Sequence, residues 1–366
     1  LILPYETITS PGCRCDRFRN KANRRRPRRP SDPRGSEPRR KLANEPFTTG
    51  ADGSSYSLYA MASQSTITGN GFAHPVIRVL LETHLSFLDH FDRAHNADLQ
   101  SWTPWLQGDA LLGYVQDNFK ERGLSFGLWQ ESESGLVIPS QSEGDLNQLF
   151  ARFAKNAYEE GLLWSWVGEP FPVKASVTDS TRFVMERTLT APLGCLTFGV
   201  HLNGFVRTQT GIELWVAKRS QSKPTFPGKL DNIVAGGQPA GLGLFENLIK
   251  ECSEEAGISE AQASQSIATG TVSYRYTDGR GLKRDILYCY DLELPDSFVP
   301  MCQDGEVEFF ERLPIQDVLA IIETTDAFKY NCNLVIIDFA IRHGILTGDN
   351  TPDYASLCER RNQLRS

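Results

Sequence analysis

Apolar residues recur at helical spacing in five stretches of the chain. The clearest covers residues 245–256, where apolar side chains stand at i, i+3, i+4, i+7 and i+11: Phe245, Leu248, Ile249, Cys252 and Ala256. This spacing predicts an amphipathic helix with one buried face, and Gly257 stands where a left-handed residue would end it. Similar stripes predict helices over residues 75–94, 145–160, 314–323 and 333–343.

Shorter apolar runs bounded by turn residues predict strands. Two hairpins are expected, one from residues 200–206 and 212–217, the other from residues 270–276 and 285–294. Further strands are expected in residues 106–114, 126–138, 161–172 and 306–312. Because strands mixed with several helices are typical of layered α/β folds, this order of elements favours an α/β sandwich.

Composition and pattern divide the chain into four segments. Residues 1–70 are predicted to be a disordered basic segment, 71–190 an accessory α/β domain, 191–348 a second domain and 349–366 a tail. Residues 1–60 hold 13 Lys/Arg and 6 Asp/Glu, a net charge of +7, with the Arg and Pro content of a disordered segment. This segment could be an organellar presequence, a basic localisation or nucleic-acid-binding tail, or not part of the functional protein. We favour the last interpretation, since Met61 resembles an ordinary start.

The rest of the chain excludes several classes of function. With a total net charge of −7, residues 61–366 carry −14, which argues against a nucleic-acid-binding surface there. No apolar run approaches the roughly 20 residues of a membrane span. Eight cysteines without paired spacing are typical of reduced thiols, so we expect a cytoplasmic protein, or a mitochondrial one if residues 1–60 are a genuine presequence. Monomer and homodimer remain open.

Two groups of side chains are candidates for metal binding. Glu251, Glu254 and Glu255 share one face of the helix predicted over residues 245–256. Repulsion between them would be relieved by Mg²⁺ or Mn²⁺, which prefer carboxylate oxygens; the alternative is a solvated acidic face. Four histidines also fall close together, but their spacing favours surface or helix-end positions over a metal site: His74, His84, His90 and His95.

The stretch from Gly236 to Ile258 resembles the signature of the Nudix hydrolases, in which a glycine loop precedes a helix with the pattern Arg-Glu-apolar-x-Glu-Glu-x-Gly-apolar. The matching positions are Gly236, Glu251, Cys252, Glu254, Glu255, Gly257 and Ile258. Two positions depart: Leu242 replaces a Glu, and Lys250 replaces the Arg with which that Glu usually forms an ion pair bracing the loop. Because both partners have changed together, no charge is left unpaired by the departure.

The flanking sequences resemble one branch of that family, whose members are labelled thiamine-pyrophosphokinase-related and carry an extra N-terminal domain. The resemblance covers about residues 72–348 and implies a Nudix α/β/α sandwich with a mixed sheet, preceded by a smaller α+β domain. It also implies a diphosphatase that converts damaged thiamine diphosphate analogues, such as oxo- and oxythiamine diphosphate, to the monophosphate and phosphate. The alternatives are another nucleoside-diphosphate-linked substrate, different chemistry on the same fold, or a non-hydrolytic binding module.

The resemblance and the residue pattern together assign roles in the candidate site. The expected metal ligands are Glu251, Glu254, Glu255 and Gly236. The expected catalytic carboxylates are Glu254, Glu255 and Glu306, with Glu308 as an alternate general base on the same strand face. Substrate binding is expected from Gly237, Lys218 and Arg219, of which at most one of the two cations can face the site. Lys250, Leu242 and Gly257 are expected to be structural, and the aromatic side chains that either stack on a substrate ring or pack in the core are Trp215, Phe226 and Tyr274.

Overall fold

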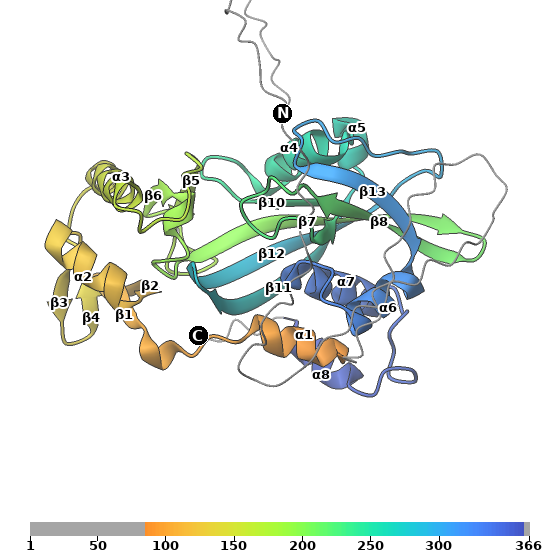
Figure 1. Ribbon diagram of the computed structural model, residues 1–366, viewed down its shortest axis with the longest axis horizontal. Coiled ribbons are helices and arrows are strands. Elements are labelled where there is room, and N and C mark those ends of the chain that lie inside the picture. Colours follow the sequence, from red (N-terminus) through yellow and green to blue (C-terminus); the bar gives the residue numbers. More distant parts are fainter. Residues whose placement is uncertain (1–84, 362–366) are drawn as a thin grey trace, which may run out of the picture. The chain divides into compact units, whose positions relative to one another are not determined.

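A seven-stranded mixed sheet forms the centre of the described part of the chain, residues 85–361 of the computed structural model, all within the compact unit Pro75–Ser366 (Figure 1). The strand order is β11-β12-β7-β8-β13, with β10 added beside β7 and β9 beside β8. Only β7 and β12 run parallel. The strands are β7 (Leu196–Thr208), β8 (Gly211–Arg219), β9 (Leu230–Asn232), β10 (Val234–Gly237), β11 (Ile267–Asp278), β12 (Gly281–Glu293) and β13 (Val307–Pro314).

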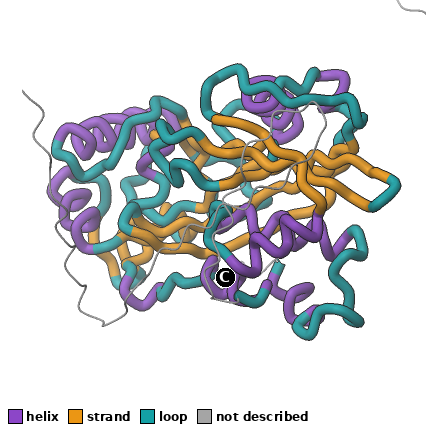
Figure 2. The backbone as a smooth tube through the Cα atoms, turned by 45° about the vertical axis from the view of Figure 1, so that its right-hand side comes forward, coloured by secondary structure: helices purple, strands orange, loops and turns teal. Residues whose placement is uncertain are grey.

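Helices cover both faces of this sheet, as the purple segments on either side of the orange strands show in Figure 2. Alternate residues of a strand point to opposite faces, so Val200 and Leu202 of β7 pack against one helical layer and Phe205 against the other. The first layer holds α4 (Leu244–Ala256) and α5 (Glu260–Ala263). The second holds α1 (Phe87–Ala94), α6 (Ile315–Thr324), α7 (Tyr330–Arg342) and α8 (Tyr354–Arg360). The expected α/β/α sandwich with a mixed sheet is confirmed.

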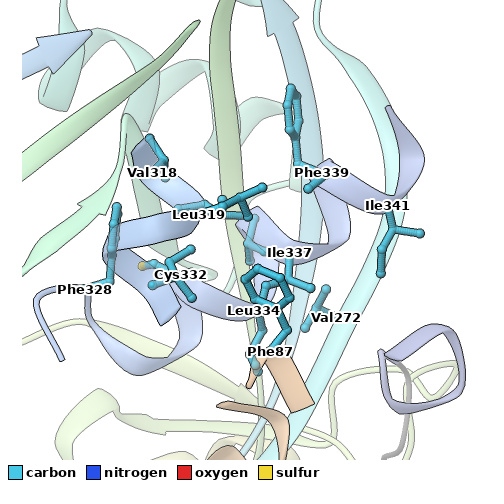
Figure 3. Packing of buried hydrophobic residues seen from close by; sticks show 14 of the residues in the cluster. Phe87, Val272, Val318, Leu319, Phe328, Cys332, Leu334, Ile337, Phe339 and Ile341 are labelled. Carbon is cyan, nitrogen blue, oxygen red and sulfur yellow. The ribbon is translucent and has the colours of Figure 1, made fainter. Parts of the chain in front are cut away.

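The second layer draws on segments far apart in sequence. Figure 3 shows Phe87 of α1 beside Val272 of β11 and Leu334 and Ile337 of α7. Helix α1 therefore packs with the large sheet, although the sequence prediction places it in the accessory domain 71–190. Helix α8 also packs against α1, so the predicted tail 349–366 contributes a structured element. Both departures arise because α1 packs against α7 and α8, and buried residues of all three helices belong to one hydrophobic core.

Residues 99–189 form an accessory module with its own aromatic core around Trp105, Trp129 and Phe150. One sheet has the order β2-β1-β4-β3, and β5 pairs with β6. The strands are β1 (Thr103–Gln107), β2 (Ala110–Val115), β3 (Gln130–Ser132), β4 (Gly135–Val137), β5 (Pro170–Val173) and β6 (Phe183–Glu186). The helices are α2 (Asp117–Phe126), α3 (Glu143–Glu159) and the short 3₁₀ turns η1 (Leu99–Ser101) and η2 (Arg187–Leu189).

Several local predictions for this module were wrong. Residues 161–169 form a loop between Gly161 and Gly168, both with positive φ, and only Pro170–Val173 is a strand. Helix α2 was missed because it buries only Phe119 and Gly123, too few positions for an apolar stripe. The helix expected over residues 75–94 begins at Phe87 within the described chain. Residues 1–84, including the basic segment, Met61, His74 and His84, lie outside the described residues.

Backbone hydrogen bonds join the accessory module and the large sheet through residues 190–195, which connect them in the chain. Leu282 N–H at the start of β12 donates to the Ala191 carbonyl at 2.9 Å, and Tyr114 N–H donates to the Leu193 carbonyl at 3.0 Å. Gly281 makes this approach feasible: its φ is +134°, and a Cβ there would stand 2.7 Å from the Pro192 nitrogen and closer still to the Ala191 carbonyl. The junction therefore requires glycine at position 281.

Gly281→Ala is expected to lower the free energy of unfolding by about 2–4 kcal/mol, because a Cβ would both clash with backbone and strain φ. Urea unfolding of the two proteins measures the difference. Gly279→Ala is the matched control in the same turn, where a Cβ would meet nothing within 4 Å. Equal losses in the two variants would contradict this account of the junction.

Candidate active site

The site is built on the junction of β10 and α4. The backbone N–H of Gly243, the residue before α4, donates to Glu246 Oε2 at 2.9 Å, which caps the helix start. At the other end Gly257 has φ +63°, and Ile258 N–H donates to the Cys252 carbonyl at 2.9 Å. Gly257 therefore ends the helix as predicted.

The predicted apolar face of α4 is only partly buried. Leu248, Cys252 and Ala256 have no exposed surface, whereas Ile249 is half-buried. Phe245 is 39% exposed and lies beside the ring of Tyr290. Phe245 is the second residue of α4 and is not among the buried residues of that helix, so the prediction of a buried Phe245 was wrong.

Two of the three helix glutamates turn toward β10. Glu255 is 7% exposed and accepts a hydrogen bond from Ala235 N–H at 2.7 Å. Burial, reinforced by the charge of Glu251, raises the pKa of Glu255 to about 8. Burial also raises the pKa of Glu251, an effect that Lys250 opposes. Glu254 instead is half-exposed and pairs with Lys250 at 2.7 Å. The face predicted to carry three carboxylates thus carries one buried carboxylate, Glu255, one largely buried, Glu251, and one half-exposed, Glu254.

These residues fit a divalent metal ion. A buried carboxylate, Glu255, and a largely buried one, Glu251, both have raised pKa values, and a divalent ion would neutralise their charge. Because Gly236 has no side chain, the carboxylate of Glu251 can lie directly against it. A Cβ at position 236 would stand 2.7 Å from Glu251 Oε1 and closer to Glu251 Cδ. The tight approach between Gly236 and Glu251 therefore joins two residues of the predicted metal site.

A second group of potential metal ligands comes from β7, β9 and α7. His201, Asp231 and Cys332 form the one group of three such residues found among residues 85–361, with ligand atoms within 4.8 Å of one another. Arg219 pairs with Asp231 at 2.7 Å and Lys329 lies 3.7 Å from the same carboxylate. Burial lowers the pKa of His201 to about 4, so the ring is neutral near pH 7. Because two cations already balance Asp231, we interpret the cluster as a buried polar network.

The glycine loop is held without the ion pair typical of the signature. Lys250 bonds to Glu251 at 3.2 Å and to Glu254 at 2.7 Å, within its own helix. Leu242 is 40% exposed, so its side chain does not hold the loop by packing into the core. Two amides hold the loop instead: Gln238 Nε2 donates to the Leu242 carbonyl at 2.8 Å, and Asn247 Nδ2 donates to the Gly237 carbonyl at 2.8 Å. These amides were missed because their partners are backbone atoms, which leave no signal in the sequence.

A cavity of about 250 Å³ extends from Gly236 and Gly237 along the sheet face on which Lys283, Asp285 and Leu287 of β12 lie. Its wall also includes five residues of the accessory module: Trp164, Val167, Phe171, Arg187 and Thr188. The three helix glutamates are not among its lining residues; Glu251 and Glu255 contact the β10 wall from the other side. Glu306 does line the cavity, and its carboxylate pairs with Lys223.

Some of the other predicted site residues line the cavity, and some do not. Phe226 and Tyr274 line it, whereas Trp215 and Lys218 do not. Lys218 and Arg219 are adjacent on β8 and so point to opposite faces. Arg219 lines the cavity, but its guanidinium is engaged by Asp231 and by the carbonyls of Thr225 and Phe226. The remaining lining cations were missed because they come from separate segments: Arg187, Lys223, Arg280, Lys283 and Lys329.

The metal-free protein is expected to lose stability as pH rises from about 4.5 to 8. The folded pKa of Glu255 is about 8, well above its ordinary value, so its protonated form stabilises the fold below pH 4.5 and that contribution is lost as pH passes through 8. The loss amounts to at most about 5 kcal/mol. Urea unfolding in a chelator measures it. Glu255→Gln keeps an acceptor for Ala235 N–H and should flatten the profile; parallel profiles would contradict the assignment.

Comparisons with known proteins identify relatives of the chain. The family profile described as NUDIX domain matches residues 200–332. Nudix hydrolase 20, chloroplastic, of Arabidopsis thaliana is 38% identical over 288 residues, 75% of this chain and 77% of that protein. Nudix hydrolase 24, chloroplastic, of the same plant is 37% identical over 281 residues, with the same coverage. A solved structure from Deinococcus radiodurans is 22% identical, covers 46% of this chain and 98% of its own, and has a TM-score of 0.37.

Proposed function

Since this chain belongs to the Nudix hydrolase family, we propose that it hydrolyses the diphosphate linkage of a small molecule with Mg²⁺, or Mn²⁺ in its place. The observation that carries the proposal is a pair of glutamates, the buried Glu255 and the largely buried Glu251, held against Ala235 and Gly236 of the strand that walls the cavity. A solvated acidic face would not bury them.

The proposed roles follow from this placement. When bound, a divalent cation withdraws charge from phosphate oxygens and promotes the ionisation of water. Glu251 and Glu255 would hold the ion, and Glu254 could join them by leaving Lys250. Glu306 faces the cavity and is the candidate that accepts the proton of the attacking water. Lys223 holds the Glu306 carboxylate in place through their ion pair.

We further propose damaged thiamine diphosphate analogues as the substrates, as the resemblance to the thiamine-pyrophosphokinase-related branch implies. Aromatic side chains at the cavity support a ring-bearing substrate. The Arg280 guanidinium lies 4.7 Å from the ring centre of Phe226 and 5.8 Å from that of Trp164. Asp278 pairs with Arg280, but the guanidinium is the charged group that lies over these rings, so we expect it to disfavour the positively charged thiazolium of thiamine relative to the uncharged ring of oxothiamine.

A panel of diphosphates tests this function: oxothiamine, oxythiamine and thiamine diphosphates, sugar nucleotides and NADH, each with and without Mg²⁺. Release of monophosphate and phosphate from oxothiamine diphosphate, faster than from the two thiazolium compounds and abolished by a chelator, is the expected result. Hydrolysis of sugar nucleotides alone would replace the thiamine proposal. No hydrolysis of any diphosphate would favour a non-hydrolytic binding module.

The compartment is a separate proposal. All six cysteines among the described residues are free, which supports a reducing compartment such as the cytoplasm. No helix in residues 85–361 is long and apolar enough to cross a membrane. The two plant relatives carry the word chloroplastic in their names, so a fluorescent fusion of the full chain should be compared with both cytoplasmic and organellar markers.

A further inference from the structure

We propose that the accessory module completes the active site: Arg187 of this module and Lys283 of β12 together form a subsite for a phosphate group of the substrate. This inference rests on the proposed diphosphatase function and deepens it. It gives residues 99–189 a direct part in substrate binding, beyond packing against the sheet.

Arg187 reaches the glycine loop from the start of η2. Its guanidinium lies 5.1 Å from the ring centre of Phe171, and Nη1 pairs with Glu169 at 2.9 Å. Nη2 stands 3.2 Å from where a Cβ of Gly237 would be. Ring and carboxylate thus fix the plane of the guanidinium, with one N–H edge directed at the loop next to Gly236. An arginine held in one plane is suited to phosphate recognition.

Lys283 is the one cation lining the cavity that forms no ion pair with the described residues. Five of the six cations lining the cavity have a carboxylate within 4.0 Å: Arg187 with Glu169, Arg219 with Asp231, Lys223 with Glu306, Arg280 with Asp278, and Lys329 with Asp231. Lys283 has no such partner among residues 85–361. Asp285, two residues away on the same strand face, instead accepts hydrogen bonds from the hydroxyls of Thr197 and Tyr274.

The surroundings of Lys283 favour a bound anion. Burial lowers its pKa, and the nearby charges of Arg280, Arg187 and Lys329 lower it further, although Asp285 opposes them. Such an ammonium group is costly to keep charged unless an anion joins it. A phosphate group has the charge and the acceptor oxygens to bind Lys283 and the free edge of Arg187 at once.

The position of the subsite defines the substrate class. Arg187 Nη2 lies against Gly237, the residue that follows the Gly236 in contact with Glu251, so a phosphate bound there adjoins the glycine loop on its cavity side. Arg280, Phe226 and Trp164 then face the organic part of the molecule. The subsite therefore selects compounds with a diphosphate next to an uncharged aromatic ring, and single phosphates should bind more weakly.

The test measures binding apart from catalysis. Methylenediphosphonate, a diphosphate analogue that cannot be hydrolysed, is titrated into chelator-treated protein by calorimetry. Arg187→Ala and Lys283→Met are each expected to weaken its binding about 10-fold or more, since a hydrogen bond to a charged group contributes about 1.5–3 kcal/mol. Arg187→Lys should recover part of the loss, because it restores charge without the planar edge.

Arg207→Ala is the matched control. Arg207 also lies over a phenylalanine ring, at 5.3 Å from Phe205, and pairs with a glutamate, Glu293, at 3.2 Å, but it is not a lining residue of this cavity. Its replacement should change binding less than twofold. Thermal unfolding verifies that each variant is folded, and Arg187→Gln and Lys283→Gln are made in parallel so that both positions are tested in folded protein.

The results separate this inference from the proposed function. If wild-type protein hydrolyses diphosphates but the variants at positions 187 and 283 bind and turn over like Arg207→Ala, the subsite is overturned and the hydrolase stands. If no diphosphate is hydrolysed but methylenediphosphonate binding depends on both residues, the subsite stands without the hydrolase. Failure of wild-type protein to bind methylenediphosphonate also overturns the subsite.

Discussion

Glu255→Gln is expected to lower the turnover number about 100-fold or more while the protein stays folded. The neutral side chain keeps an oxygen that accepts the Ala235 N–H bond but removes the charge that would hold a divalent cation. Metal ions contribute several kcal/mol to such reactions, and each 1.36 kcal/mol corresponds to a factor of ten in rate. Steady-state kinetics with Mg²⁺ at saturating substrate measure the loss.

Two other glutamates of α4 provide the comparison. Glu246→Gln alters the capping residue, which lies near the start of the helix, and should leave turnover within about twofold of wild type. Glu254→Gln should have an intermediate effect, because the Glu254 side chain is half-exposed and pairs with Lys250. Unchanged turnover in Glu255→Gln would remove that residue from the catalytic site, whatever Glu254→Gln shows.

Gly236→Ala is expected to abolish most activity with little loss of stability. The added Cβ would overlap the carboxyl end of Glu251, and this end of a flexible side chain can rotate away where backbone could not. The fold therefore survives while the carboxylate leaves its place, and we expect kcat/KM to fall about 100-fold or more with a weaker apparent affinity for Mg²⁺. Kinetics across a range of Mg²⁺ concentrations measure both effects.

The stability of Gly236→Ala provides an internal check. Its free energy of unfolding should fall by less than that of Gly281→Ala, where the added Cβ would meet the backbone of Ala191 and Pro192. If Gly236→Ala unfolds as readily as Gly281→Ala, its loss of activity says nothing about Glu251. If it is stable and fully active, the close approach of β10 to α4 is unimportant for catalysis.

Local patterns were sufficient for the centre of the fold. The hairpins β7–β8 and β11–β12 and the helices α3, α4, α6 and α7 were predicted, because each has an apolar stripe or alternation within its own segment. Predictions failed where burial depends on distant residues. Phe245 belongs to the helical repeat of apolar residues, yet its side chain is exposed. Residues 161–169 contain apolar side chains and were predicted as part of a strand, but they form a loop.

The features of the candidate site also divide into those that the sequence predicts and those that only the structure shows. The sequence alone determined the glycine loop, the spacing of Glu251, Glu254 and Glu255, and the cap at Gly257, because all lie within one strand–helix segment. Only the tertiary structure decided that Lys250 pairs within its own helix, that Glu255 is buried while Glu254 is half-exposed, and that Arg187 and Lys283 line the same cavity. Helical periodicity shows which residues share a face, but which of them become buried depends on segments that the rest of the chain brings against that face.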